Sequence, residues 1–225
     1  VVLPERSRAG KRTGALIGAA VLAVIVAYAV FVPLIAGTDQ KLTDFSSARL
    51  PPSAAHPFGT DHAGRDLFIR LASGLRVSLL IAVLCALASM GLGMLIGAVS
   101  AALGGRTDRI VMRVVDGINA VPHLLLGVVI VAMFRGSVTA IIASIALTHW
   151  TQVARIVRAE VLSLRSREYV EAAYLLGSTR REGLRRHFLP GTLAQGVVGT
   201  VMLLPHAIWH ESTLSFLGLG LPPDQ

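Results

Sequence analysis

The stretch EAAYLLGSTRREGLRRHFLP, residues 171–190, separates two strongly apolar parts of the chain and is rich in arginine. Gly177 is placed to end one short helix, because glycine readily adopts the left-handed conformation that follows a helix C-terminus. Thr179 and Glu182 have the spacing of a capping box, which would begin the next helix. Pro190 stands where a further helix can open into the membrane. The stretch therefore predicts a helix–glycine–helix element at the membrane surface, suited to docking another protein.

The composition predicts an integral membrane protein. The 225 residues are 53% hydrophobic, the mean hydropathy is +0.66, and several runs reach the roughly 20 apolar residues that a spanning helix needs. The net charge of +8 is compatible with nucleic-acid binding. However, no basic and aromatic module accompanies it, and the arginines cluster at the ends of apolar runs, as the positive-inside rule describes. We expect an all-α integral membrane protein, a polytopic helical bundle with five spans.

Apolar stretches alternate with polar or basic ones along the chain. The predicted order is a cytoplasmic segment (1–13), a first span (14–36), an external loop (37–74), a core domain (75–221) and a short external end (222–225). Within the core domain, spans are expected at 75–103, 110–134, 138–157 and 188–221, with a cytoplasmic coupling segment at 158–190.

The basic residues predict the orientation. Four of them lie between Arg6 and Arg12, ahead of the first span, and place the N-terminus in the cytoplasm. Alternate crossing then puts the loop at 104–109 and the coupling segment on the same side. Five spans leave the C-terminal end outside, so we expect a sixth span beyond this sequence that returns to the cytoplasm.

The external loop contains HPFGTDHAGRD, residues 56–66. Gly59 and Gly64 allow turns, and Asp61, Arg65 and Asp66 are expected to pair with one another. We favour a structured loop over a ligand-binding one.

Small residues recur every fourth position in the second span, at Ser89, Gly93, Gly97 and Ala101. Such a stripe lets helix backbones approach closely inside a membrane. The predicted seam faces either another helix of the same chain or a partner subunit.

Polar and polarisable side chains inside the predicted spans are candidates for a substrate path. His206 and His210 are four residues apart and share a helix face. Imidazole and thioether ligands suit nickel, cobalt or copper, but no firm metal site follows, because such side chains also hydrogen-bond neighbouring helices. His123, beside Pro122, is expected to satisfy carbonyls freed by a helix break. The candidates for the path are His149, Trp150, Met202, His206, His210 and Glu211.

Several motifs together resemble one family. Glu171-Ala172-Ala173, Gly177 and Leu189-Pro190 resemble the EAA loop in the membrane subunits of bacterial ABC importers. His187, just ahead of Phe188, is similar to the form of that loop in the dipeptide, oligopeptide and nickel branch. Four further stretches are similar to elements of the same branch: 56–66, 113–122, 154–165 and 215–220.

The resemblance implies a type I ABC importer permease in the bacterial cytoplasmic membrane. In that family a second, similar permease pairs with the chain, two cytoplasmic ATPases dock on the EAA loops, and an external binding protein delivers the substrate. ATP and Mg would be bound by the ATPases, so no cofactor is expected in this chain. The residues implied to contact the ATPase are Glu171, Ala172, Ala173, Leu176, Gly177, His187, Leu189 and Pro190, with Glu171–Leu176 as the coupling helix.

The chain is predicted to be a transport subunit and not an enzyme, since the sequence contains no G-x-x-x-x-G-K-[ST] motif for a P-loop. Short peptides are the leading substrate, and nickel or another chelated transition metal is the alternative. A remote alternative is an intramembrane metalloenzyme on His206, His210 and Glu211, which would need a third ligand. An ATP-independent carrier is equally remote, because it gives no reason for the EAA loop.

Overall fold

The computed structural model describes residues 8–36, 44–134 and 137–220. The predicted start of the chain (1–7) and its predicted external end (222–225) lie outside these ranges. Within them the chain is helical and contains no strand. The chain divides into two compact units at Ser78, inside one long helix, and each unit is described by itself.

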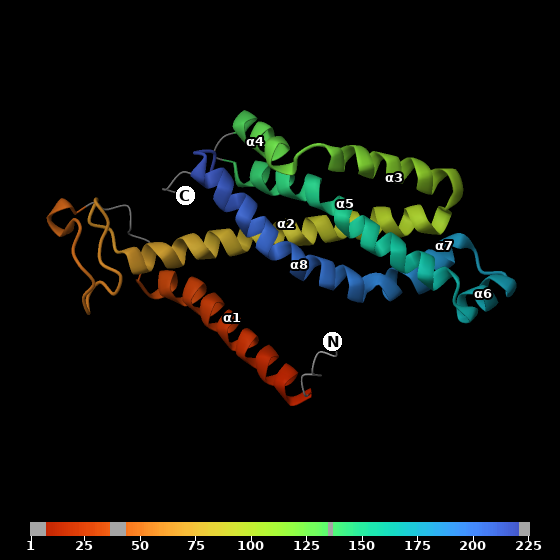
Figure 1. Ribbon diagram of the computed structural model, residues 1–225, viewed down its shortest axis with the longest axis horizontal. Helices are drawn as coiled ribbons and strands as arrows, with labels where there is room; N and C mark the ends of the chain where they lie inside the picture. The colour runs from red at the N-terminus through yellow and green to blue at the C-terminus, as the bar shows by residue number, and fades with distance from the viewer. Residues whose placement is uncertain (1–7, 37–43, 135–136, 221–225) are drawn as a thin grey trace, which may run out of the picture. The chain divides into compact units, whose positions relative to one another are not determined.

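Figure 1 shows the helices in chain order. They are α1 (Arg8–Ala36), the 3-10 turn η1 (Phe45–Ser47), α2 (Leu67–Leu103), α3 (Gly105–Ala120), α4 (His123–Met133), α5 (Val138–Arg165), α6 (Glu168–Leu175), α7 (Arg180–Gly183), the π-helical turn η2 (Leu184–Phe188) and α8 (Leu189–Phe216).

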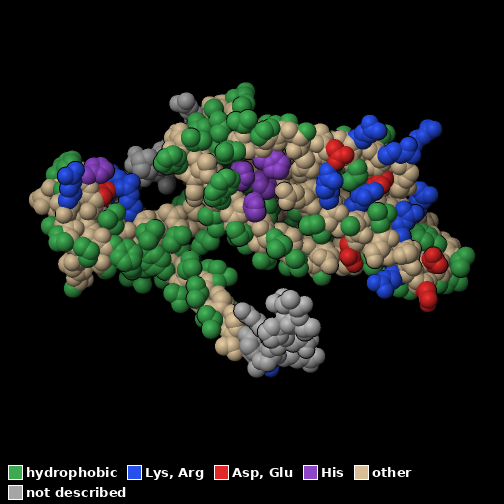
Figure 2. Space-filling model, in the orientation of Figure 1, with side chains coloured by type: hydrophobic (Ala, Val, Ile, Leu, Met, Phe, Trp, Pro, Cys, Tyr) green, Lys and Arg blue, Asp and Glu red, His purple; other side chains and the backbone are tan. Residues whose placement is uncertain are grey.

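The apolar helices confirm the all-α, polytopic membrane class. Four are long and apolar enough to cross a bilayer, at 12–36, 67–103, 138–165 and 180–216, and the bent pair α3–α4 would make a fifth span. Hydrophobic side chains cover much of the outer surface of these helices (Figure 2). On α2 the exposed residues include Leu80, Leu87 and Leu95, as expected for helices that face lipid.

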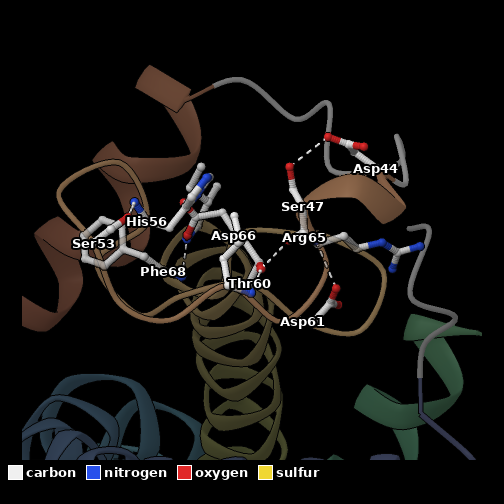
Figure 3. A network of polar contacts seen from close by, with 11 residues as sticks. Asp44, Ser47, Ser53, His56, Thr60, Asp61, Arg65, Asp66 and Phe68 are labelled. Atoms are coloured by element: carbon white, nitrogen blue, oxygen red, sulfur yellow. Dashed lines mark hydrogen bonds and ion pairs between the residues drawn. The ribbon is translucent and has the colours of Figure 1, made fainter.

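In the first unit, an ordered loop leads into α2 (Figure 3). The Thr60 hydroxyl donates to the Ser47 carbonyl at 2.5 Å and accepts from the Leu50 N–H at 2.8 Å. Gly59 and Gly64 have φ values of 73° and 77°, so the predicted turns are confirmed. A Cβ on Gly64 would lie 1.9 Å from the Asp44 carbonyl oxygen, which leaves room for glycine alone.

Of the pairing expected among Asp61, Arg65 and Asp66, the structure shows one contact, in which the Asp61 carboxylate accepts from the Arg65 N–H at 3.0 Å. Asp66 pairs with other residues. Asp66 accepts from the Phe68 N–H at 2.7 Å and so caps α2, which therefore begins at Leu67 and not at the predicted 75. His56 lies 2.9 Å from Asp66, and Arg70, one turn into α2, lies 2.5 Å from Asp61. Partial burial acts to raise the pKa of Asp61, but two backbone N–H donors and Arg70 hold that pKa below its ordinary value.

The third predicted span is not a straight helix. α3 ends at Ala120, α4 begins at His123, and the two are bent by 79°. Pro122 lacks an N–H and disfavours the helical conformation at the preceding residue, and Val121 is extended, with φ −83° and ψ 129°. The third span, expected over 110–134, is therefore broken beside Pro122, where the sequence predicts a helix break. The loop expected at 104–109 is wrong, because α3 already begins at Gly105.

The stripe of small residues on α2 packs against α5, within the second unit. Ser89 and Ala101 are buried, and a Cβ added to Gly97 would lie 2.4 Å from the carbonyl oxygen of Ala154. Gly93 approaches the preceding turn of α5 just as closely. Of the two alternatives left open by the sequence, the structure therefore places the seam within the chain.

The seam predicts opposite effects for two glycines of α2. Gly97→Ala should destabilise the protein by about 1–3 kcal/mol, because the new methyl group meets backbone that cannot move easily. Gly91→Ala is the matched control. A Cβ there meets nothing within 4 Å, and alanine favours the helix by up to about 1 kcal/mol. Thermal unfolding of the purified variants in detergent checks this, and equal midpoints for the two variants would contradict the seam.

Candidate coupling surface and substrate path

The coupling segment begins inside α5, which continues past the predicted boundary at 157 to Arg165. α6 then ends as predicted at Gly177, which has φ 94°. The Gly177 N–H donates to the Tyr174 carbonyl and the Ser178 N–H to the Ala173 carbonyl, both at 3.0 Å. These two bonds form a Schellman motif, in which a residue of positive φ closes the helix end.

The capping box of Thr179 and Glu182 is also confirmed. The Glu182 N–H donates to the Thr179 hydroxyl at 3.3 Å, and the Thr179 N–H donates to the Glu182 carboxylate at 2.9 Å. The helix that it starts continues through η2 into α8. α8 begins at Leu189 with Pro190 in its first turn, where the sequence placed a helix start. The turn just ahead of α8 is π-helical, and Pro190, which follows it, has no N–H to donate to the preceding turn.

One side of the coupling segment packs against α2 and α5, and the other side exposes apolar residues. Val170 and Phe188 are fully buried and pack with α2 and α5 in one hydrophobic cluster. Tyr174 covers Gly183, where a Cβ would lie 2.4 Å from the tyrosine hydroxyl. Leu175 and Leu176 are each 88% exposed. A rigidly anchored element thus presents two leucines to the outside, as a docking surface requires.

The remaining residues implied for ATPase contact divide between these two sides. Glu171, Ala172, Gly177 and Pro190 are exposed, whereas Ala173, His187 and Leu189 are partly buried. The His187 ring lies 5.8 Å from the Tyr169 ring, and Leu189 packs on the cluster of Phe188. The structure therefore leaves the first four open to a partner and gives His187 and Leu189 packing positions.

Two arginines of the coupling segment bind the C-terminal end of α2. Arg165 donates to the Ala101 carbonyl at 2.9 Å, and Arg180 donates to the Leu103 carbonyl at 3.1 Å. The last carbonyls of a helix have no partner within the helix, and cationic side chains there are favourable. Sequence reasoning missed this clamp, because the arginines lie 64 and 77 residues from their acceptors.

Two Arg–Asp pairs join α3 to α5. Arg158 forms a bidentate pair with Asp108, with two N–O distances of 2.6 Å, and Ser100 of α2 donates to the same carboxylate at 2.7 Å. Arg155 pairs with Asp116, whose side chain is 62% exposed, compared with 15% for Asp108. The Asp108 pair therefore ties together three helices at the end where the coupling segment lies.

Four histidines from three helices come together in the second unit. The His149 ring of α5 lies 5.3 Å from that of His123 on α4, and 6.4 Å and 5.0 Å from those of His206 and His210 on α8, measured between ring centroids. Figure 2 shows histidines gathered near the middle of the helices, away from the arginine-rich end. We call these four residues the histidine cluster.

His149 is the buried centre of the histidine cluster. Its Nδ1 lies 2.9 Å from the Ile145 carbonyl oxygen. A carbonyl can only accept, so in the neutral ring Nδ1 carries the hydrogen and Nε2 keeps its lone pair. Nε2 is therefore the atom of His149 able to accept a hydrogen bond or contact a metal.

The other candidates for the substrate path do not all join the histidine cluster. Trp150 packs with Val115 and Ala154 in a separate hydrophobic group. Met202 is exposed on α8, and buried Glu211 accepts from the Ser215 hydroxyl at 2.9 Å. In the described part of the chain, no three His, Cys, Asp or Glu side chains are arranged to hold a metal ion. The sequence placed His206 and His210 on one helix face, but it gave no sign that His123, expected to satisfy carbonyls at a helix break, would lie beside His149.

Comparison with known proteins places this architecture in a family. The family model "Binding-protein-dependent transport system inner membrane component" matches residues 89–224. The model "N-terminal TM domain of oligopeptide transport permease C" matches residues 8–52. The chain therefore belongs to the family of inner-membrane components of binding-protein-dependent transport systems, a family of ABC importer permeases.

Curated relatives include transporters of two substrate classes. The oligopeptide permease OppC of Bacillus subtilis is 38% identical over 92% of this chain and 68% of its own length. The dipeptide permease DppC of the same organism is 36% identical over 95% of this chain and 67% of its own length. The nickel permease NikC of Escherichia coli K12 is 38% identical over 81% of this chain and 66% of its own length. The chain is accordingly a multi-pass permease subunit of an ABC importer.

The two Arg–Asp pairs predict unequal effects on stability. Arg158→Ala leaves the largely buried Asp108 without its main partner, and we expect a loss of about 3 kcal/mol, at the lower end of the range for breaking a buried pair. Arg155→Ala is the matched control on the same helix and should cost about 0–1 kcal/mol, because its partner is largely exposed. Thermal unfolding in detergent measures both. A loss for Arg155→Ala as large as that for Arg158→Ala would contradict the proposed difference between the pairs.

Proposed function

We propose that this chain is one of two permease subunits in an ATP-driven importer of short peptides. A second, similar permease would pair with it, two cytoplasmic ATPases would dock on it and bind ATP and Mg, and an external binding protein would deliver the peptide. The N-terminus would lie in the cytoplasm. The observation that carries the proposal is the coupling segment, whose buried side is fixed to α2 and α5 while Leu175 and Leu176 are exposed.

The contacts of the coupling segment support a mechanical role. A force applied at α6 reaches α5 directly, α2 through Arg165 and Arg180, and α8 through the continuous helix from Arg180. ATP-driven closure of the two ATPases would draw two such segments together. The spanning helices would then switch between outward-open and inward-open states, as in other systems with two packed arrangements of rigid elements.

Short peptides are the first candidate substrate, and the printed names of the oligopeptide and dipeptide relatives support this choice. The histidine cluster would provide polar groups in the path. A second candidate is a chelated transition metal, because the rings of three histidines lie around that of His149 and imidazole is a favoured ligand of such metals. The ion would have to arrive with ligands of its own, since the cluster is not arranged to hold a bare ion.

Uptake by cells that contain the assembled importer separates the two candidates. We expect a labelled dipeptide to accumulate in an ATP-dependent manner and labelled nickel not to accumulate. His206→Ala should lower the rate of dipeptide uptake several-fold, because a polar group of the path is lost, whereas Val201→Ala, also exposed on α8, should leave it unchanged.

Two outcomes would contradict the peptide assignment. Accumulation of nickel without dipeptide, abolished by His206→Ala, would establish the second candidate. Accumulation of neither compound by a correctly assembled complex would mean that the cargo belongs to another class.

A further inference from the structure

The charges of α3 are divided between two faces. This helix carries two aspartates, and both point toward α5, where Asp108 pairs with Arg158 and Asp116 pairs with Arg155. Its arginines, Arg106, Arg109 and Arg113, are exposed. None of these three forms an ion pair within the described ranges, so the outer face of α3 has uncompensated positive charge.

Two of these arginines line a groove together with two apolar residues. Arg109, Ile110, Arg113 and Val114, all exposed on α3, line a shallow and open depression of about 470 Å³, which we call the groove. Residues four apart lie above one another on a helix, so the two arginines form one row and the two apolar residues form the next. Val115 is fully buried and packs on α5, so the opposite side of α3, which carries the groove, faces away from α5.

The groove lies near the end of spanning helices. α3 follows α2 after the single residue Gly104, and the last carbonyls of α2 are bound by arginines of the coupling segment. Arg109 and Arg113 thus lie one to two turns from the end of a helix that is long and apolar enough to cross a bilayer. Ends of spanning helices commonly lie in the headgroup region, where lipid phosphates are found beside the start of the acyl chains.

We propose that this groove binds an anionic phospholipid, with the phosphate held by Arg109 and Arg113 and the start of an acyl chain against Ile110 and Val114. Guanidinium groups bind phosphate oxygens in a bidentate manner. Basic pockets at the ends of spanning helices are typical sites for anionic headgroups. A protein partner fits less well, because the buried core of a protein interface is mostly apolar, and here a charged row runs along the whole groove.

The test uses the full-length subunit in its assembled complex, purified in detergent and mixed with phosphatidylglycerol or phosphatidylcholine. Native mass spectrometry counts the lipids that stay bound. We expect wild-type protein to retain phosphatidylglycerol preferentially. Arg109→Gln with Arg113→Gln should lower this retention about tenfold or more, since each arginine near a membrane surface contributes about 1 kcal/mol.

The matched control is Arg181→Gln with Arg185→Gln, which removes two exposed arginines at the same spacing from the coupling segment. This variant should retain phosphatidylglycerol like the wild type. The proposal is overturned if the α3 variant binds as much lipid as the wild type, or if both variants lose it equally, because the effect would then reflect overall charge. Displacement of the lipid by millimolar inorganic phosphate would also overturn it, since the groove would then be a phosphate site. Size-exclusion profiles and unfolding midpoints confirm that the variants are folded.

Discussion

The carbonyl groups at the end of α2 are the constraint on which the arrangement of the second unit depends. A long apolar helix that ends beside other helices leaves carbonyls that must find donors. Here the donors are Arg165 and Arg180, which flank α6 in the coupling segment. The same bonds that complete α2 therefore fix the coupling segment to it. Asp108, held by Arg158 and Ser100, adds the beginning of α3 to this junction.

The polar groups of this unit lie in two separate regions, one at the junction formed by the end of α2, the coupling segment and the start of α3. Arginines gather at one end, where they complete helices and leave α3 with a positive outer face, and the histidine cluster lies farther along the same helices (Figure 2). α5 and α8 take part in both regions. A movement at the junction can therefore reach the histidine cluster through rigid helices, which is the physical requirement for coupling ATP hydrolysis to transport in the proposed function.

Local signals in the sequence predicted local structure well. The end of α6 at Gly177 and the capping box at Thr179 depend on neighbouring residues and are as predicted. The helix break at Pro122 was expected from the proline, but hydropathy carries no information on its angle of 79°. The partners of Arg158 and the convergence of His123 with His149 depend on contacts between distant parts of the chain, which no spacing rule contains. The apolar stripes predicted that helices would pack, but not which ones.

The most direct test of the account is the turn at Gly177, measured as ATP-dependent uptake by the assembled importer. Gly177 has a positive φ and no atom near its missing side chain, so a substitution there acts on the turn and not on packing. Gly177→Val should abolish uptake while membrane insertion and assembly remain, because a β-branched residue resists this conformation. Gly177→Asn, which tolerates it better, should retain most of the uptake. Equal uptake by the two variants would contradict the claim that the coupling segment transmits the movement.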